Sequence, residues 1–180
     1  MNRTIMTPDW QEPQLSTPSI LTEWLLDPSS LTAKLKAISS DFRVQLLFQQ
    51  EQACQAHEAD FLGITANDAT LVREVLLLCD NTPWVYARSI LPLAALSNAD
   101  QALAKMGTNP LGEQLFSRSD IQPGRIQVAQ FSPDTKPGQL NTQYYRAQNP
   151  LWGRRRMFHL QHGAISVAEV FLSPTPCYAN

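Results

Sequence analysis

The segment from Thr70 to Cys79 restricts the possible folds of this 180-residue chain more than any other stretch. With the two-residue period of a strand, one face carries Leu71, Arg73, Val75 and Leu77, and the other carries Val72, Glu74, Leu76 and Leu78. Both faces are mostly apolar, which predicts a central strand of a sheet that is covered on each side. One of the two charges is therefore expected to be sequestered from water.

The last thirty residues predict a second pair of strands with a buried charge. An arginine-dense strand from Trp152 to Gln161 turns at His162-Gly163 into an apolar strand from Ala164 to Leu172, and a two-residue connection suits a tight hairpin. Alternation places Glu169 on one face with Ile165, Val167 and Phe171. Because burial disfavours a carboxylate, Glu169 is paired with a cation, held protonated or completed by a ligand. The pattern alone also allows a purely structural ion pair between Arg73 and Glu169.

Short helices are expected in two places. Ser19 to Leu26 and Leu31 to about Ile38 form one helical hairpin, broken at Asp27-Pro28 and capped by Ser29 or Ser30. Ser97 or Asn98 caps a helix through Met106, and Pro110 starts a helical turn that carries Leu111. Further strands are expected at Phe42 to Gln49, with Phe42, Val44, Leu46 and Phe48 inward, at Trp84 to Leu91 and at Ile126 to Phe131, and Ser132 to Pro150 is expected to be a polar loop.

Five sequence blocks, taken in order, resemble the chorismate pyruvate-lyase family. They are Val72 to Leu77, Pro83 to Arg88, Pro110 to Gly112, Leu151 to Arg155, and Ala168 to Pro176. No single block is specific for the family, but the ordered set is. The match spans about Leu21 to Tyr178. The resemblance implies a single α+β domain over residues 19–180 after a loosely ordered leader, residues 1–18. It further implies an antiparallel sheet with helices on one side and two helix-turn-helix flaps over a buried ligand.

The resemblance also implies an activity and its residues. The family consists of cofactor-free carbon-oxygen lyases that remove pyruvate from chorismate and leave 4-hydroxybenzoate, the first step of ubiquinone biosynthesis. Arg73 is expected to bind the ring carboxylate through its planar fork, and Glu169 to hold the ring hydroxyl. Both are expected to be catalytic. Substrate contacts through the main chain are implied at Leu31 and Leu111, one on each helical hairpin.

Three consecutive arginines remain to be placed. Alternation sends Arg154 and Arg156 to the face of Trp152, and Arg155 to the opposite face, so the three cannot serve one site. We expect Arg154 or Arg155 to lie near the enolpyruvyl carboxylate of the substrate. Arg88 is a weaker candidate, because a stacked or snorkelling strand residue is the commoner role for such a side chain.

Composition excludes several other classes of protein. Fourteen basic against 16 acidic side chains do not provide the positive charge of a nucleic-acid binder. No apolar run approaches the roughly 20 residues of a membrane span, so we expect a cytoplasmic protein without stable membrane insertion. The nearly neutral charge and the absence of a heptad repeat lead us to expect a monomer. The three cysteines lack close spacing, which predicts reduced thiols, with Cys79 in the core and Cys177 accessible. The histidines lack neighbours at metal-ligand spacing, and no phosphate-binding glycine motif is present.

A second class of function shares the expected fold. A similar domain serves as the ligand-sensing part of some transcription regulators, and such a non-catalytic module would also hold a small carboxylate. The arginine block and the glutamate block match the enzyme family together, which favours the lyase.

Overall fold

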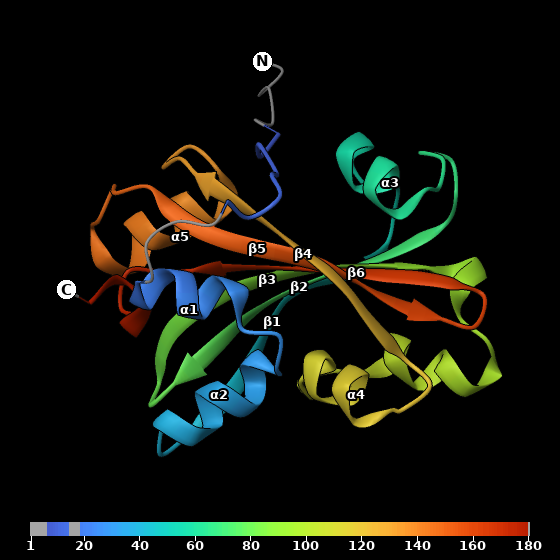
Figure 1. The fold of residues 1–180 in the computed structure, drawn as a ribbon, viewed down its shortest axis with the longest axis horizontal. Coiled ribbons are helices and arrows are strands. Elements are labelled where there is room, and N and C mark those ends of the chain that lie inside the picture. The colour runs from blue at the N-terminus through green and yellow to red at the C-terminus, as the bar shows by residue number, and fades with distance from the viewer. Residues whose placement is uncertain (1–6, 15–18, 180) are drawn as a thin grey trace.

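The fold is built on one six-stranded antiparallel sheet (Figure 1). The structure is a computed structural model that describes residues 7–14 and 19–179. Its strands are β1 (Phe42–Glu51), β2 (Thr70–Cys79), β3 (Thr82–Pro92), β4 (Gln122–Phe131), β5 (Leu151–Leu160) and β6 (Gly163–Phe171). They lie in the order β1-β2-β3-β6-β5-β4, which leaves β1 and β4 at the two edges.

Strand β2 is buried along its whole length, as its two apolar faces predict. It pairs with β1 on one side and β3 on the other. Arg73 is 2% exposed and Glu74 is 5% exposed, so both charges, and not one, are withdrawn from water. The two side chains lie on opposite faces of the sheet and therefore enter different surroundings.

Helices cover both faces of the sheet (Figure 1). The face that we name the flap face is covered by α1 (Ile20–Leu26), α2 (Leu31–Ile38), the 3₁₀ helix η2 (Asn98–Lys105) and α4 (Leu111–Ser117). The opposite back face is covered by α3 (Ala56–Leu62) and α5 (Lys136–Tyr145). The short 3₁₀ helices η1 (Leu93–Ala95) and η3 (Pro176–Tyr178) complete the set. The expected arrangement, with helices on one side of the sheet, therefore holds for the flap helices only. Strands β2 and β3 are apolar on the back face too, and α3 and α5 cover them there.

The first helical hairpin follows the sequence pattern closely. The Ser19 hydroxyl accepts a hydrogen bond from the Thr22 amide at the start of α1, and the Ser30 hydroxyl accepts one from Ala33 at the start of α2. Helices of seven and eight residues are marginal alone, so packing must hold them. Their apolar residues join one cluster with the sheet: Trp24, Leu25, Leu31 and Leu35 pack with Val75, Val85 and Phe171.

Three expectations from the sequence need correction. The register of β1 shifts between Leu46 and Phe48, and this bulge leaves Leu46 39% exposed instead of inward. The expected loop after Ser132 contains the helix α5, which begins after a Thr135 cap. Its polar sequence shows no clear helical pattern. Cys177 is 2% exposed and not accessible.

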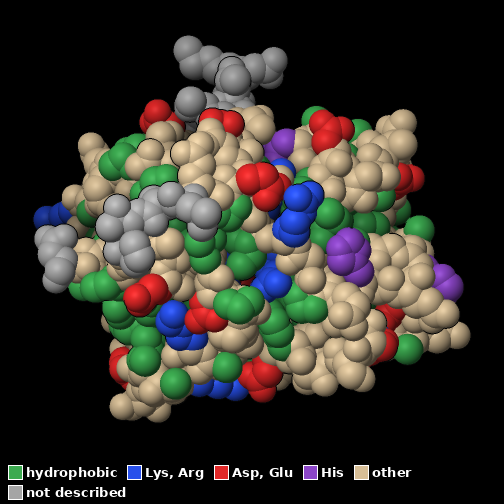
Figure 2. Space-filling model, in the orientation of Figure 1, with side chains coloured by type: hydrophobic (Ala, Val, Ile, Leu, Met, Phe, Trp, Pro, Cys, Tyr) green, Lys and Arg blue, Asp and Glu red, His purple; other side chains and the backbone are tan. Residues whose placement is uncertain are grey.

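The expected leader lies partly outside the described residues, which omit 1–6 and 15–18. Within the described part, Gln11 pairs with Val128 through two backbone hydrogen bonds of 2.9 Å at the edge of the sheet. No helix among residues 7–14 and 19–179 is long and apolar enough to cross a membrane. Acidic and basic side chains are interspersed on the surface seen in Figure 2.

Gly153 is required by close packing between β5 and its neighbours. A Cβ atom there would lie 2.8 Å from the Phe131 ring and 2.9 Å from the Glu169 carbonyl oxygen. We predict that Gly153→Ala lowers the free energy of unfolding by about 1–3 kcal/mol, the usual cost of overpacking. Urea unfolding measures the loss. Gly112→Ala is the control, because its Cβ would meet only Thr32 Oγ1 at 3.6 Å. Equal stability of the two variants would contradict this account of Gly153.

Candidate functional site

A belt of polar side chains crosses the flap face between its two apolar clusters. In one row across the sheet, Arg73 pairs with Ser89, Ser89 with Val167, and Val167 with Arg156. In the next row, Glu169 pairs with Arg154. The belt thus gathers residues from β2, β3, β6 and β5, and three of them are charged and almost fully buried: Arg73, Arg154 and Arg156.

Arg73 is held by neutral oxygens. Its Nη1 donates to Gln49 Oε1 at 2.9 Å and to the Gly107 carbonyl at 2.7 Å, and its Nη2 donates to the Asn109 carbonyl at 3.0 Å. Burial lowers the pKa of the guanidinium, although an arginine keeps its charge in proteins. In residues 7–14 and 19–179, no carboxylate lies within ion-pair distance of Arg73. Three hydrogen bonds leave part of the five-donor guanidinium for a ligand.

Glu169 forms its ion pair with Arg154 and not with Arg73. Arg154 Nε donates to Glu169 Oε2 at 3.0 Å. The Nη1 atom of the same arginine donates to the carbonyls of Trp24, Leu25 and Asp27 at 3.3, 3.4 and 2.6 Å. These carbonyls end α1, where backbone acceptors have no partner within the helix. Glu169 Oε1 accepts no hydrogen bond from the described residues, so one carboxylate oxygen remains for a ligand.

Arg156 lies where the two helical hairpins approach each other. Its Nη1 donates to the Pro28 carbonyl and its Nη2 to the Gly124 carbonyl, both at 3.0 Å. The guanidinium carbon lies 5.7 Å from the ring centre of Phe116 in α4 and 5.5 Å from that of Phe158. Burial and the nearby charge of Arg154 lower the pKa of Arg156, while Glu169 acts in the opposite direction.

The helical hairpins meet over the belt. Leu31 and Leu111 are the first residues of α2 and α4 and are 4% and 6% exposed. Backbone N–H groups in a first helical turn have no partner within their helix. Lys36 Nζ of α2 lies 2.6 Å from Glu113 Oε2 of α4, so the hairpins touch each other as well as the sheet. Both main-chain positions implied by the resemblance therefore lie on the flap face.

Arg155 and Arg88 lie on the back face, away from the belt. The Arg155 guanidinium carbon lies 3.9 Å from the ring centre of Phe61, and burial lowers its pKa to about 10. Arg155 Nε donates to Gln127 Oε1 at 2.9 Å. The structure does not bring Arg155 together with Arg73 and Glu169, because alternation along β5 turns it away.

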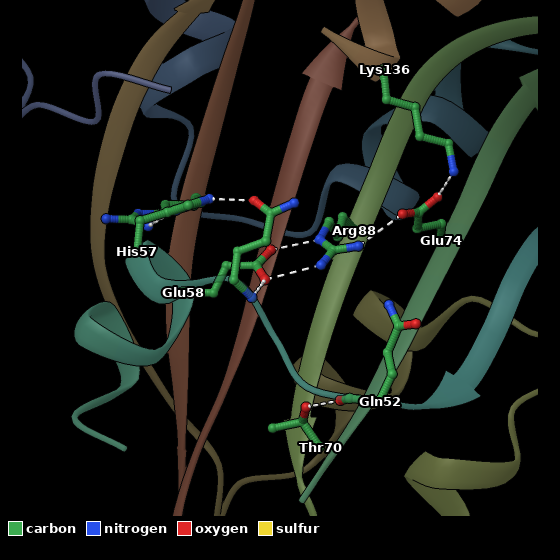
Figure 3. Close-up of polar contacts among 9 residues, drawn as sticks. Gln52, His57, Glu58, Thr70, Glu74, Arg88 and Lys136 are labelled. Atoms are coloured by element: carbon green, nitrogen blue, oxygen red, sulfur yellow. Dashed lines mark hydrogen bonds and ion pairs between the residues drawn. The ribbon is translucent and has the colours of Figure 1, made fainter. Parts of the chain in front are cut away.

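Arg88 belongs to a charge network on the back face, shown in Figure 3. It lies between Glu58 of α3 and Glu74 of β2, with nitrogen-to-oxygen distances of 2.5 and 2.8 Å, and Lys136 of α5 pairs with the other oxygen of Glu74. Burial opposes the charge of Arg88, but hydrogen bonding and attraction from Glu58 raise its pKa above the ordinary value. The network therefore replaces the snorkelling role expected for Arg88. The sequence did not point to Glu58, because the segment that contains α3 shows no clear hydrophobic period of a helix or a strand.

A cavity of about 730 Å³ lies beside this network, lined by Trp10, Tyr86, Phe131 and Lys136 among others. The charges at its wall already pair with one another, so they offer little unfilled hydrogen-bonding capacity. The flap face differs, because its buried cations outnumber its carboxylate. Charge balance therefore favours the flap face over this cavity as the candidate site.

Known proteins resemble this chain in sequence along most of its length. A family model described as Chorismate lyase matches residues 5–179. "Probable chorismate pyruvate-lyase" of Shewanella sp. (strain ANA-3) is 42% identical over 155 residues, covering 86% of this chain and 80% of the relative. The protein of the same name from Pseudoalteromonas translucida (strain TAC 125) is 41% identical over 169 residues, covering 93% of each chain.

Solved structures with this fold include an effector domain and a transcriptional regulator. The effector domain of PhnF from Mycobacterium smegmatis has a TM-score of 0.62 at 15% identity, covering 82% of this chain and 90% of that one. A GntR-family transcriptional regulator from Bacillus cereus has a TM-score of 0.57 at 15% identity, covering 76% of this chain and 94% of that one. At these identities the likeness shows the fold alone.

The back-face network predicts a stability effect. Arg88→Met leaves Glu58 and Glu74 buried with less compensating charge, so we expect a loss of about 3–5 kcal/mol in the free energy of unfolding. Urea unfolding measures it. Lys36→Met is the control, because its ion pair with Glu113 is about half exposed and such pairs contribute roughly 0–1 kcal/mol. A loss below 1 kcal/mol for Arg88→Met would show that the network does not stabilise the fold.

Proposed function

The chain belongs to the chorismate lyase family, and we propose that it is a chorismate pyruvate-lyase that converts chorismate into 4-hydroxybenzoate and pyruvate. One observation carries the assignment of the site. Arg73 and Glu169 lie on the flap face beneath both helical hairpins, and each keeps hydrogen-bonding capacity for a ligand. We further propose a cofactor-free monomer in the cytoplasm, acting at the first step of ubiquinone biosynthesis.

The reaction needs positioning more than it needs a chemical group from the protein. The ether bond between the ring and the enolpyruvyl oxygen breaks, and its electron pair leaves with that oxygen. The hydrogen on the neighbouring, hydroxyl-bearing ring carbon is lost as a proton, and its bonding pair completes the aromatic ring. The departing enolpyruvate gains one proton at its methylene carbon and becomes pyruvate. Because the ring becomes aromatic, the site has mainly to hold a reactive conformer and stabilise developing charge.

Arg73 is assigned to the ring carboxylate. Its guanidinium is fixed by Gln49, Gly107 and Asn109, so little conformational entropy is lost when the ligand arrives. The planar fork suits a carboxylate, and burial strengthens the attraction. Two of these anchors belong to the segment between η2 and α4, which links carboxylate binding to the second hairpin.

Glu169 is assigned to the ring hydroxyl, which becomes the phenol of the product. Arg154 fixes one carboxylate oxygen at 3.0 Å and leaves the other for the hydroxyl. The first-turn amides at Leu31 and Leu111 are assigned to further substrate contacts from the two hairpins. Closure of both hairpins over the belt excludes water, which strengthens each of these interactions.

Incubation of the purified protein with chorismate tests the assignment directly. With a chelator present and no nucleotide added, chromatography of the products should give equal amounts of 4-hydroxybenzoate and pyruvate. Absence of turnover, together with tight binding of a small carboxylate, would instead favour the sensing module that shares the fold. A different aromatic product would indicate a lyase of another specificity.

Arg73→Ala should weaken 4-hydroxybenzoate binding by about 2–5 kcal/mol, because it removes one partner of a buried charge pair. Arg73→Lys should recover little of this loss, since lysine lacks the planar fork. Isothermal calorimetry measures both. Arg43→Ala is the matched control, because Arg43 lies on the edge strand β1 and its nitrogen donates to Asn81 in the turn after β2. Parental affinity in Arg73→Ala would remove Arg73 from the site.

Glu169→Gln should lower turnover by a factor of roughly 10² or more, the range for a single electrostatic or acid-base group. The substitution keeps shape and hydrogen bonding but removes the negative charge. Steady-state rates with chorismate and calorimetry with 4-hydroxybenzoate separate catalysis from binding, and the affinity for product should change much less than the rate. Turnover at the parental rate would reduce Glu169 to a structural partner of Arg154.

A further inference from the structure

The buried charges on the flap face do not balance. Three arginines are almost fully buried there, with exposed fractions of 2% for Arg73, 3% for Arg154 and 8% for Arg156. The carboxylate that lies among these described side chains is Glu169. Glu169 neutralises Arg154 through their ion pair. Within the part of the chain that the structure describes, neither Arg73 nor Arg156 lies within ion-pair distance of a carboxylate. Two buried positive charges are therefore left without a negative partner.

An uncompensated buried charge is unfavourable, so a site of this kind is completed by a ligand of opposite charge. The substrate under the proposed function carries two carboxylates, one on the ring and one on the enolpyruvyl group. Arg73 has already been assigned to the ring carboxylate. We propose that Arg156 binds the enolpyruvyl carboxylate and is thereby the residue that selects a dicarboxylate substrate; this inference rests on the proposed function.

The register of the sheet supports this pairing of arginines. Arg73 and Arg156 lie in the same row, separated by Ser89 and Val167 on the two intervening strands. Three steps of roughly 4.8 Å between neighbouring strands place their main chains about 14 Å apart. Two long side chains and one ring-sized ligand can fill that distance. Glu169 lies one row away, next to the middle of the span, where the ring hydroxyl is assigned.

The hydrogen bonds of Arg156 leave a donor for the carboxylate. Nη1 donates to Pro28 and Nη2 to Gly124, whereas Nε is buried and has no partner among the described residues. A buried N–H group without an acceptor is unfavourable, and a carboxylate oxygen would supply the acceptor. Pro28 belongs to the turn between α1 and α2, and Phe116 belongs to α4, so both hairpins cover this guanidinium. Ligand entry between the hairpins would lead to Arg156.

The neighbouring arginines are less suited to the role. Arg154 already uses Nε for Glu169 and Nη1 for three carbonyls at the end of α1. Arg155 lies on the back face over Phe61. Arg88 lies between Glu58 and Glu74 on that same face. The second carboxylate therefore falls to the arginine that the sequence pattern had left without a function.

The test compares a ligand that has two carboxylates with one that has a single carboxylate. Arg156→Gln should lower kcat/KM for chorismate by roughly 30-fold or more, mainly through KM, because one partner of a buried charge pair is lost. The dissociation constant of 4-hydroxybenzoate, which lacks the second carboxylate, should stay within about threefold of the parental value. Arg155→Gln is the matched control on the next residue of β5 and should leave the kinetics with chorismate within about threefold.

A second variant covers the case in which Arg156→Gln does not fold. Arg156→Lys keeps the charge but loses Nε and the planar fork, so kcat/KM for chorismate should fall by about tenfold, with 4-hydroxybenzoate affinity again unchanged. An equal loss of affinity for both ligands would overturn the proposal, because Arg156 would then only anchor the hairpins. Unchanged kinetics with chorismate in the folded variants would overturn it as well.

Failure of the proposed function would be recognised separately. If the parental protein releases no 4-hydroxybenzoate from chorismate, the lyase assignment fails, whatever the variants do. Calorimetry with chorismate then still tests Arg156, since binding of the second carboxylate does not need turnover. Equal chorismate affinity of the parental protein and Arg156→Gln in that experiment would overturn the role of Arg156 on its own.

Discussion

The ion pair between Glu169 and Arg154 joins the sheet to the first helical hairpin. Its carboxylate comes from β6, its guanidinium from β5, and the remaining donors of Arg154 satisfy carbonyls at the end of α1. One buried arginine thus orients the candidate catalytic carboxylate and fixes the end of the helix that covers it. The turn at Pro28 and the start of α2 come directly after this attachment in the chain, so it helps to position the cover of the site.

Charge satisfaction separates the two faces of the sheet. On the back face, Glu58, Glu74, Arg88 and Lys136 pair among themselves and connect α3 and α5 to β2 and β3. On the flap face, in the part of the chain that the structure describes, Glu169 pairs with Arg154, whereas Arg73 and Arg156 donate to main-chain carbonyls. Charges that are already paired hold the structure together, whereas charges that lack a partner mark the place for an anionic ligand. The back-face cavity therefore carries less functional information than the buried arginines of the flap face.

Local patterns in the sequence predicted the structure correctly where a side chain's position depends only on a strand period or on a helix cap. Alternation correctly separated Arg154 and Arg156 from Arg155, and the expected serine cap correctly located the start of α2. The same reasoning failed where a single residue interrupts the period, as in the bulge of β1 that exposes Leu46. It also failed for α5, because a polar helix that packs through Leu140 and Tyr145 lacks a clear apolar stripe.

The sequence by itself determined that β2 is a central strand, that Glu169 faces inward and that Arg73 and Glu169 belong to the blocks of one lyase family. The first two conclusions depend on side-chain order along single strands, which the backbone period translates directly into faces, and the third rests on the resemblance of the ordered blocks. Only the tertiary structure decided that Glu169 pairs with Arg154, that Arg155 and Arg88 lie on the back face, and that Arg156 has no carboxylate partner among the described residues. Pairing of charges depends on the order of strands in the sheet and on helices from distant segments of the chain. The spacing of neighbouring residues predicts neither of them.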